Sequence, residues 1–142
     1  MLRAVVIDDI DTIRTKNIDM IKANCPNIVI IGQANSVESG VSLIKQIAPD
    51  LVFLDVEMPY GNGFDLLNTF DEINFEVIFI TAYDRFALPA LKAEALDYIL
   101  KPFTENDLVN SVKKAEQRIR DKRIVKSKDI ISERILTGKR IA

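Results

Sequence analysis

The chain has 142 residues, 48% of them hydrophobic and 28% charged, which is typical of one folded domain and argues against wholesale disorder. It has no histidine and a single cysteine, which excludes histidine zinc sites, Ser–His and Cys–His dyads and an internal disulfide. No apolar stretch approaches the ~20 residues that cross a bilayer, and the N-terminus does not resemble a signal peptide. We therefore expect a cytoplasmic protein with no membrane partner and a reduced Cys25.

The net charge of −2 conceals an asymmetry along the chain. Residues 1–112 carry eight basic and 17 acidic side chains, whereas residues 113–142 carry 11 basic and four acidic side chains. Only the second part would suit an acidic partner such as nucleic acid. That part contains no helix-turn-helix, zinc site or basic–aromatic pattern, so it is not expected to read DNA by itself.

Short apolar runs alternate with longer amphipathic stretches. In chain order we predict a strand at 4–7, a helix at 12–24, a strand at 28–31, a helix capped by Ser36 and ending before Pro49, a strand at 51–54, a loop at 59–63, a short helix at 64–70, a strand at 77–80, a helix at 84–94, a strand at 98–100 and a last helix capped by Thr104. Pro89 is awkward within a helix, because proline removes a backbone hydrogen bond.

Near-continuous apolar strands that alternate with helices indicate a parallel sheet covered on both faces. Right-handed crossovers then give an α/β fold, a doubly wound five-stranded parallel sheet sandwiched by five helices. In such sheets, ligands bind beyond the carboxyl ends of the strands. The residues that follow the predicted strands are therefore the candidates for a functional site.

Acidic, hydroxyl and amine side chains follow four of these strands: Asp8 and Asp9, Asp55, Thr81 and Lys101. Three neighbouring carboxylates repel one another, by about 4 kcal/mol for two charges ~4 Å apart at an effective dielectric of ~20. A hard divalent cation with oxygen ligands, best Mg²⁺, would offset this repulsion. Each residue alone has an ordinary structural explanation, but the set suits phosphoryl transfer to Asp55, with Mg²⁺ and Lys101 neutralising charge and Thr81 donating a hydrogen bond.

Four segments, VVIDD, LVFLDVEMPYGNGFDLL, VIFITAYD and ALDYILKPF, resemble the response-regulator receiver domains of two-component signalling. The resemblance covers roughly residues 2–120 and implies the flavodoxin-like receiver fold. It implies that Asp55 is the phosphoacceptor and that Asp8 and Asp9 organise Mg²⁺, with Asp9, Asp55 and the backbone carbonyl of Glu57 as metal ligands. It also implies roles at the phosphate site and in switching for the remaining matched positions: Thr81, Ala82, Tyr98, Lys101 and Pro102, the last after a cis peptide bond.

The same resemblance implies a sensor histidine kinase as phosphodonor and a population shift as the response. Thr81 would move toward the phosphoryl group, Tyr98 would turn inward, and the face built by the fourth helix, fifth strand and fifth helix would change. That face is also the candidate homodimer interface. The resemblance implies slow loss of the phosphoryl group rather than enzymatic turnover.

We predict a receiver domain at residues 1–121. Residues 122–142 are predicted to be a basic linker or the start of a C-terminal effector domain that is absent here. The ALDYILKPF segment resembles receivers joined to LytTR-type DNA-binding domains, and ILTGKRIA would then be the first strand of such a domain. Transcription control through that missing domain is the expected output, with a stand-alone receiver that acts by protein–protein contacts as the alternative.

Three other functions remain open at this stage. A phosphatase or phosphotransferase with an aspartyl-phosphate intermediate could use Glu57 as a second acid, and turnover of excess substrate would distinguish it. A degenerate receiver would bind partners without phosphorylation, although the complete acidic set argues against it. A dinucleotide-binding domain is disfavoured, because VVIDD stands where a glycine-rich turn is needed.

Overall fold

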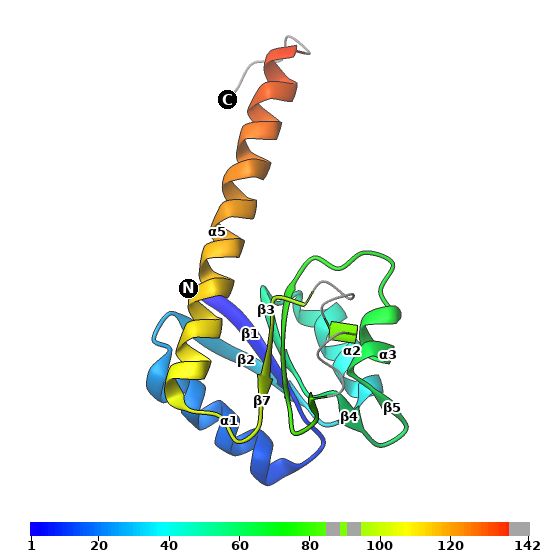
Figure 1. The fold of residues 1–142 in the computed structure, drawn as a ribbon. Helices are drawn as coiled ribbons and strands as arrows, with labels where there is room; N and C mark the ends of the chain where they lie inside the picture. Colours follow the sequence, from blue (N-terminus) through cyan, green and yellow to red (C-terminus); the bar gives the residue numbers. More distant parts are fainter. Residues whose placement is uncertain (85–88, 91–94, 137–142) are drawn as a thin grey trace.

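The computed structural model describes residues 1–84, 89–90 and 95–136, with residues 126–136 by backbone alone (Figure 1). Its centre is a five-stranded parallel sheet in the order β2-β1-β3-β6-β7. The strands are β1 (Leu2–Ile7), β2 (Ile28–Ala34), β3 (Leu51–Leu54), β6 (Glu76–Thr81) and β7 (Asp97–Leu100). All five predicted strands and the doubly wound arrangement are confirmed.

Two pairs of helices cover the two faces of the sheet. Helices α1 (Asp11–Asn24) and α5 (Glu105–Leu136) lie on one face, and α2 (Val37–Ile47) and α3 (Gly63–Asn68) lie on the other (Figure 1). Because both faces are covered, every residue of β3 is buried, which explains its unbroken apolar sequence. The fourth predicted helix, 84–94, falls mostly outside the described residues; of those described, Pro89 and Ala90 are α-helical and Asp84 is in a 3₁₀ conformation.

Side-chain caps begin α2 and α5 at the two residues that the sequence predicted, Ser36 and Thr104. The Ser36 hydroxyl accepts the Ser39 amide hydrogen at 3.1 Å and begins α2. The Thr104 hydroxyl accepts the Asp107 amide hydrogen at 3.1 Å, and the Asp107 carboxylate accepts that of Thr104 at 2.9 Å. These reciprocal bonds satisfy amide groups that have no partner inside α5.

The segment predicted as a loop after β3 contains a small antiparallel hairpin. Strand β4 (Glu57–Met58) pairs with β5 (Gly61–Asn62). The turn between them requires positive φ angles, 60° at Tyr60 and 145° at Gly61, which glycine adopts readily and tyrosine does not. The Asn62 side chain then caps α3, which therefore begins at Gly63, one residue before the predicted start.

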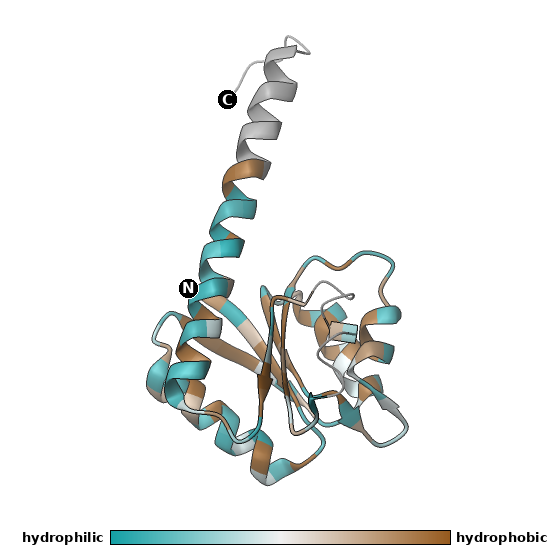
Figure 2. Cartoon of the chain, viewed as in Figure 1, coloured by the Kyte–Doolittle hydropathy of each residue, from teal (hydrophilic) through white to brown (hydrophobic). Residues whose placement is uncertain are grey.

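Helix α5 continues well beyond the sheet, as Figure 1 shows. Its first half contributes buried apolar residues to the core, and the side of that half that faces the viewer in Figure 2 is mostly hydrophilic. It crosses the predicted boundary between residues 121 and 122 without a break, so that boundary stays a prediction. Ile135 and Leu136, predicted as the start of a strand, belong to this helix, and residues 137–142 lie outside the described part. Among the described residues, none of the helices could span a membrane.

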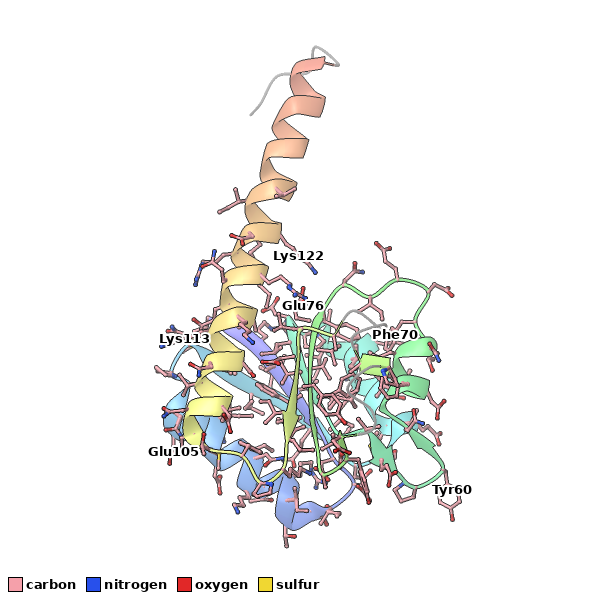
Figure 3. All side chains as sticks on the ribbon, viewed as in Figure 1. Tyr60, Phe70, Glu76, Glu105, Lys113 and Lys122 are labelled. Carbon is pink, nitrogen blue, oxygen red and sulfur yellow. The ribbon has the colours of Figure 1, made fainter. Side chains whose placement is uncertain are left out.

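Ion pairs connect α5 to the amino-terminal end of the sheet. Glu76, only 4% exposed, lies beside Lys122 (Figure 3) and forms ion pairs with Lys122 and with Arg118, the latter at 3.2 Å. Arg123 pairs with Asp50 at 3.2 Å. These contacts lie at the end of the sheet opposite the strand ends that the sequence marked as functional.

Candidate functional site

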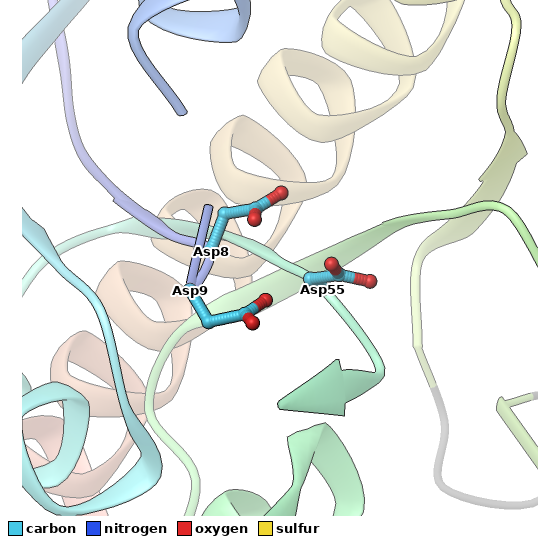
Figure 4. Close-up of side chains that lie close together, drawn as sticks. All are labelled: Asp8, Asp9 and Asp55. Carbon is cyan, nitrogen blue, oxygen red and sulfur yellow. The ribbon is translucent and has the colours of Figure 1, made fainter. Parts of the chain in front are cut away.

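The carboxyl ends of β1 and β3 bring three aspartates together. Asp8 and Asp9 follow β1 and Asp55 follows β3, and one carboxylate oxygen of each lies within 4.8 Å of the others (Figure 4). Asp8 is 2% exposed and Asp55 is 8% exposed. The convergence follows from parallel pairing, because Ile7 of β1 is the register partner of Leu54 in β3.

Hydrogen bonds hold Asp8 and Lys101 in a fixed relation. One carboxylate oxygen of Asp8 accepts the Ile10 amide hydrogen at 3.0 Å, and the other accepts the Lys101 ammonium at 3.1 Å. The same ammonium lies 3.7 Å from an oxygen of Asp55. A single fixed cation therefore contacts two of the three carboxylates.

The backbone around Lys101 is anchored to the end of β6. Its amide donates to the Thr81 carbonyl at 2.7 Å, and the Lys101–Pro102 peptide bond is cis, as the resemblance implied. The Lys101 side chain reaches Asp8 after β1 and Asp55 after β3. Thr81, Asp8 and Asp55 thus share one edge of the sheet with Lys101, which is the arrangement predicted from the strand ends.

The electrostatics of the cluster make ionisation of Asp55 more costly when no cation is bound, and they raise its pKa. Burial, Asp8 and Asp9 raise the pKa of Asp55, and the Lys101 ammonium and the Val56 amide lower it, with a net value of about 6. The fixed ammonium thus offsets only part of the cost of burying this carboxylate. A divalent cation among the carboxylates would lower that cost.

The backbone of Gly63 packs closely against the backbone carbonyl of Asp55. A Cβ atom added at Gly63 would lie 2.8 Å from the Asp55 carbonyl oxygen and 2.9 Å from the Phe79 ring, closer than real Cβ atoms approach. The Gly63 amide also donates to the Val56 carbonyl at 2.8 Å. The sequence marked this glycine only as part of a loop, because its packing under Asp55 depends on the tertiary fold.

The side chains predicted to switch lie along the end of β6 and on β7. Thr81 is fully buried, and its hydroxyl accepts the Tyr83 amide hydrogen at 3.4 Å. The Tyr98 hydroxyl donates to the Tyr83 carbonyl, and its ring centroid lies 6.2 Å from that of Phe79. Tyr83 therefore connects the Thr81 hydroxyl and the Tyr98 hydroxyl through its own backbone.

A cavity of about 370 Å³ opens over the carboxylates, and it is lined by Asp9, Ile10, Ile13, Asp55, Glu57, Met58, Pro59, Ala82, Tyr83 and Lys101. Glu57 and Ala82, both predicted from the resemblance, thus border the same space as Asp55. The role of the Glu57 backbone carbonyl as a metal ligand stays a prediction. The volume is sufficient for a hydrated cation and a phosphoryl group, since a water molecule in liquid water takes ≈ 30 Å³.

The sequence model of the response regulator receiver domain matches residues 4–113. Among curated proteins, the chain is 34% identical over 139 residues to the sensory transduction protein LytT of Bacillus cereus, covering 94% of this chain and 56% of that protein. It is 41% identical over 115 residues to an uncharacterized response regulatory protein of Vibrio cholerae, covering 80% and 48%. The chain thus spans about half the length of these curated relatives.

Solved structures agree with this assignment. The response regulatory domain of mrkE from Klebsiella pneumoniae superposes with a TM-score of 0.77 at 23% identity, over 84% of this chain and 99% of that one. The REC domain of AraT, a response regulator from Geobacillus stearothermophilus, gives a TM-score of 0.77 at 27% identity, over 86% and 98%. The first shows a shared fold, and the family match shows more: the chain belongs to the response regulator receiver domains.

Proposed function

We propose that Asp55 accepts a phosphoryl group from a sensor histidine kinase in a Mg²⁺-dependent reaction. The observation that carries this proposal is the convergence of Asp8, Asp9 and Asp55 within 4.8 Å, with the Lys101 ammonium 3.7 Å from Asp55. Oxygen ligands around a buried carboxylate suit a hard cation. A fixed ammonium beside the same carboxylate suits a transferring phosphoryl group.

The donor set fits Mg²⁺. Both carboxylate oxygens of Asp8 already accept hydrogen bonds, from Ile10 and Lys101, so we assign direct ligation to the carboxylates of Asp9 and Asp55 and to the Glu57 carbonyl. Asp8 would orient Lys101 and contribute negative charge. When bound, the cation would neutralise charge on the phosphoryl oxygens.

In the proposed step, a carboxylate oxygen of Asp55 forms a bond to phosphorus while the bond from phosphorus to the donor nitrogen breaks, and the electron pair leaves with that nitrogen. The Lys101 ammonium would bind a phosphoryl oxygen, and Ala82 would leave room for the group. The product adds about −1.5 to −2 of charge. The Thr81 hydroxyl would exchange its contact with the Tyr83 amide for one with the phosphoryl group.

This exchange would couple the site to the outer edge of the sheet. Tyr83 carries both the amide that contacts Thr81 and the carbonyl that binds Tyr98, so a shift of Thr81 would disturb the Tyr98 hydroxyl. Tyr98 would then turn inward and favour a second conformation. We propose that the face of β7, α5 and the fourth predicted helix changes in this way and forms a homodimer contact.

The output is proposed to be transcription control through a C-terminal DNA-binding domain of the LytTR type. Its support is that the LytT relatives are named sensory transduction proteins and extend well beyond the matched region. The alternative is a stand-alone receiver that acts by protein–protein contacts. Either mode suits a cytoplasmic protein.

Intact-protein mass after incubation with acetyl phosphate and Mg²⁺ tests the proposal on wild type and Asp55→Asn. One added phosphoryl group on wild type alone, lost when Mg²⁺ is withheld, is the expected result. Absence of the adduct from wild type, together with no binding of beryllofluoride, would reject the phosphoacceptor. Continued release of phosphate from excess donor would instead indicate an enzyme.

A further inference from the structure

Arg14 in the first turn of α1 is bound to three different parts of the structure. Its side chain is only 12% exposed. One terminal nitrogen donates to the Asp8 backbone carbonyl at 2.8 Å, and the other donates to the Asp11 carboxylate at 2.6 Å. Its Nε donates to the Gln33 side chain of β2 at 2.7 Å. One planar guanidinium therefore joins β2 and α1 to the turn after β1 that carries the acidic pair.

With this bond, each polar group of Asp8 has a partner. Its amide donates to the Ala34 carbonyl at 3.1 Å, its carbonyl accepts from Arg14, and its two carboxylate oxygens accept from Ile10 and Lys101. Of these four contacts, only the one from Arg14 fixes the carbonyl, the atom that leads directly into Asp9. The orientation of the Asp8–Asp9 peptide unit therefore depends on Arg14.

We propose that Arg14 is a positioning residue for the Mg²⁺ site, holding the turn of Asp8 and Asp9 so that both carboxylates face Asp55. This inference rests on the proposed function. For the removal of Arg14 it predicts a change in Mg²⁺ affinity opposite to the one that charge alone would give. Removing a positive charge near the site would strengthen cation binding if charge alone mattered, whereas loss of a group that orients the ligands weakens metal affinity, typically by 10–100-fold.

Arg3 supplies a matched control in the same chain. Its guanidinium also donates to two backbone carbonyls, those of Ile47 at 3.0 Å and Ala48 at 3.2 Å. These carbonyls lie at the C-terminal end of α2, and Arg3 lies at the end of β1 opposite the acidic pair. Arg3→Met thus removes a similar charge and similar bonds without touching the carboxylate cluster.

The test is a Mg²⁺ titration of wild type, Arg14→Met, Arg14→Lys and Arg3→Met, followed by the backbone amide NMR shifts of Asp9 and Asp55. Urea unfolding of each variant without metal measures the purely structural effect. We expect both Arg14 variants to bind Mg²⁺ at least about tenfold more weakly, while Arg3→Met binds like wild type. Arg14→Lys keeps the charge but not the planar fork, and it decides the question if Arg14→Met does not fold.

Arg14 variants that bind Mg²⁺ as tightly as wild type, or more tightly, would overturn the inference and leave the proposed function intact. Equal weakening in Arg3→Met would also overturn it, because the effect would then be general. A wild-type protein whose Asp9 and Asp55 amides do not respond to Mg²⁺ would reject the proposed metal site itself, and the inference with it.

Discussion

Replacing Asp55 by asparagine is expected to stabilise the metal-free protein at neutral pH, even though it removes the proposed phosphoacceptor. Burial raises the pKa of Asp55 to about 6 from 3.8, against the opposing effect of Lys101. The folded chain therefore keeps this proton over a pH range in which the unfolded chain has lost it. As a result, the wild-type free energy of unfolding falls as the pH rises from about 4 to about 6, and the full loss is present above that range.

The magnitude follows from the difference between the two pKa values. About two pKa units correspond to about 3 kcal/mol, and structural relaxation lowers the observable gain, so we expect 1–3 kcal/mol, roughly. Asparagine has nearly the same shape as aspartate and does not ionise. The Asp55→Asn variant should therefore escape a loss that the wild-type protein incurs at pH 7.5.

Urea unfolding in EDTA, at pH 7.5 and at pH 4, measures this effect. The variant should be more stable than wild type at pH 7.5 and nearly equal to it at pH 4. Added Mg²⁺ should stabilise wild type more than the variant, since a cation that binds only the folded state adds to its stability. A variant that is less stable than wild type at pH 7.5, or that gains equally at both pH values, would refute the reasoning.

Asp97 provides a control with the opposite sign. Burial alone would raise the pKa of Asp97, but hydrogen bonds from the Ser111 hydroxyl and the Tyr98 amide, together with the Lys114 ammonium, hold it below its ordinary value. The folded state therefore favours the ionised form, and this contribution is present above the unfolded pKa and lost as the pH falls through the folded one. Asp97→Asn should accordingly lower stability at pH 7.5.

Three further substitutions, one of them a control, test the packing next to the site and the ion pairs at the amino end of the sheet. Gly63→Ala should lower the free energy of unfolding by about 1–3 kcal/mol and slow labelling by acetyl phosphate, because its Cβ would press on the Asp55 carbonyl. Gly40→Ala, whose Cβ would meet the buried side chains of Leu66 and Ile7 and no backbone atom of Asp55, should leave labelling unchanged, and equal slowing in both would contradict this account. Glu76→Gln should cost about 1–3 kcal/mol in urea unfolding, because two cations of α5 lose a buried partner; an unchanged midpoint would show that the pairs contribute nothing.

The strands could be predicted because a strand that is buried on both faces needs an uninterrupted run of apolar residues. The full length of β2 could not be predicted, because Gly32 and Gln33 interrupt its apolar run. Both residues nevertheless pair with β1, at Val5 and Val6. The hairpin of β4 and β5 was read as a loop for a related reason. It consists of two residue pairs, and it forms only where Tyr60 accepts a positive φ, a choice imposed by the surrounding fold.

The acidic cluster could be predicted because a rule of position, the carboxyl ends of parallel strands, needs only the strand assignments. Arg14 and Gly63 could not be found in this way. Arg14 lies in an ordinary amphipathic helix, and its three bonds reach the turn after β1, strand β2 and helix α1. A contact that depends on three elements at once leaves no periodic signal in the sequence.

The two ends of the sheet have opposite effects on stability. At the carboxyl end, Asp55 is held where its charge is disfavoured, so the site destabilises the fold until a cation or a proton arrives. At the amino end, Glu76 meets two cations and Asp50 meets Arg123, so charge is compensated within the chain. Binding a cation lowers the free energy of a buried carboxylate whose charge is only partly compensated, whereas a carboxylate already paired with cations gains little from it. This difference in charge compensation between Asp55 and Glu76 supports placing the proposed metal site at the carboxyl end of the sheet.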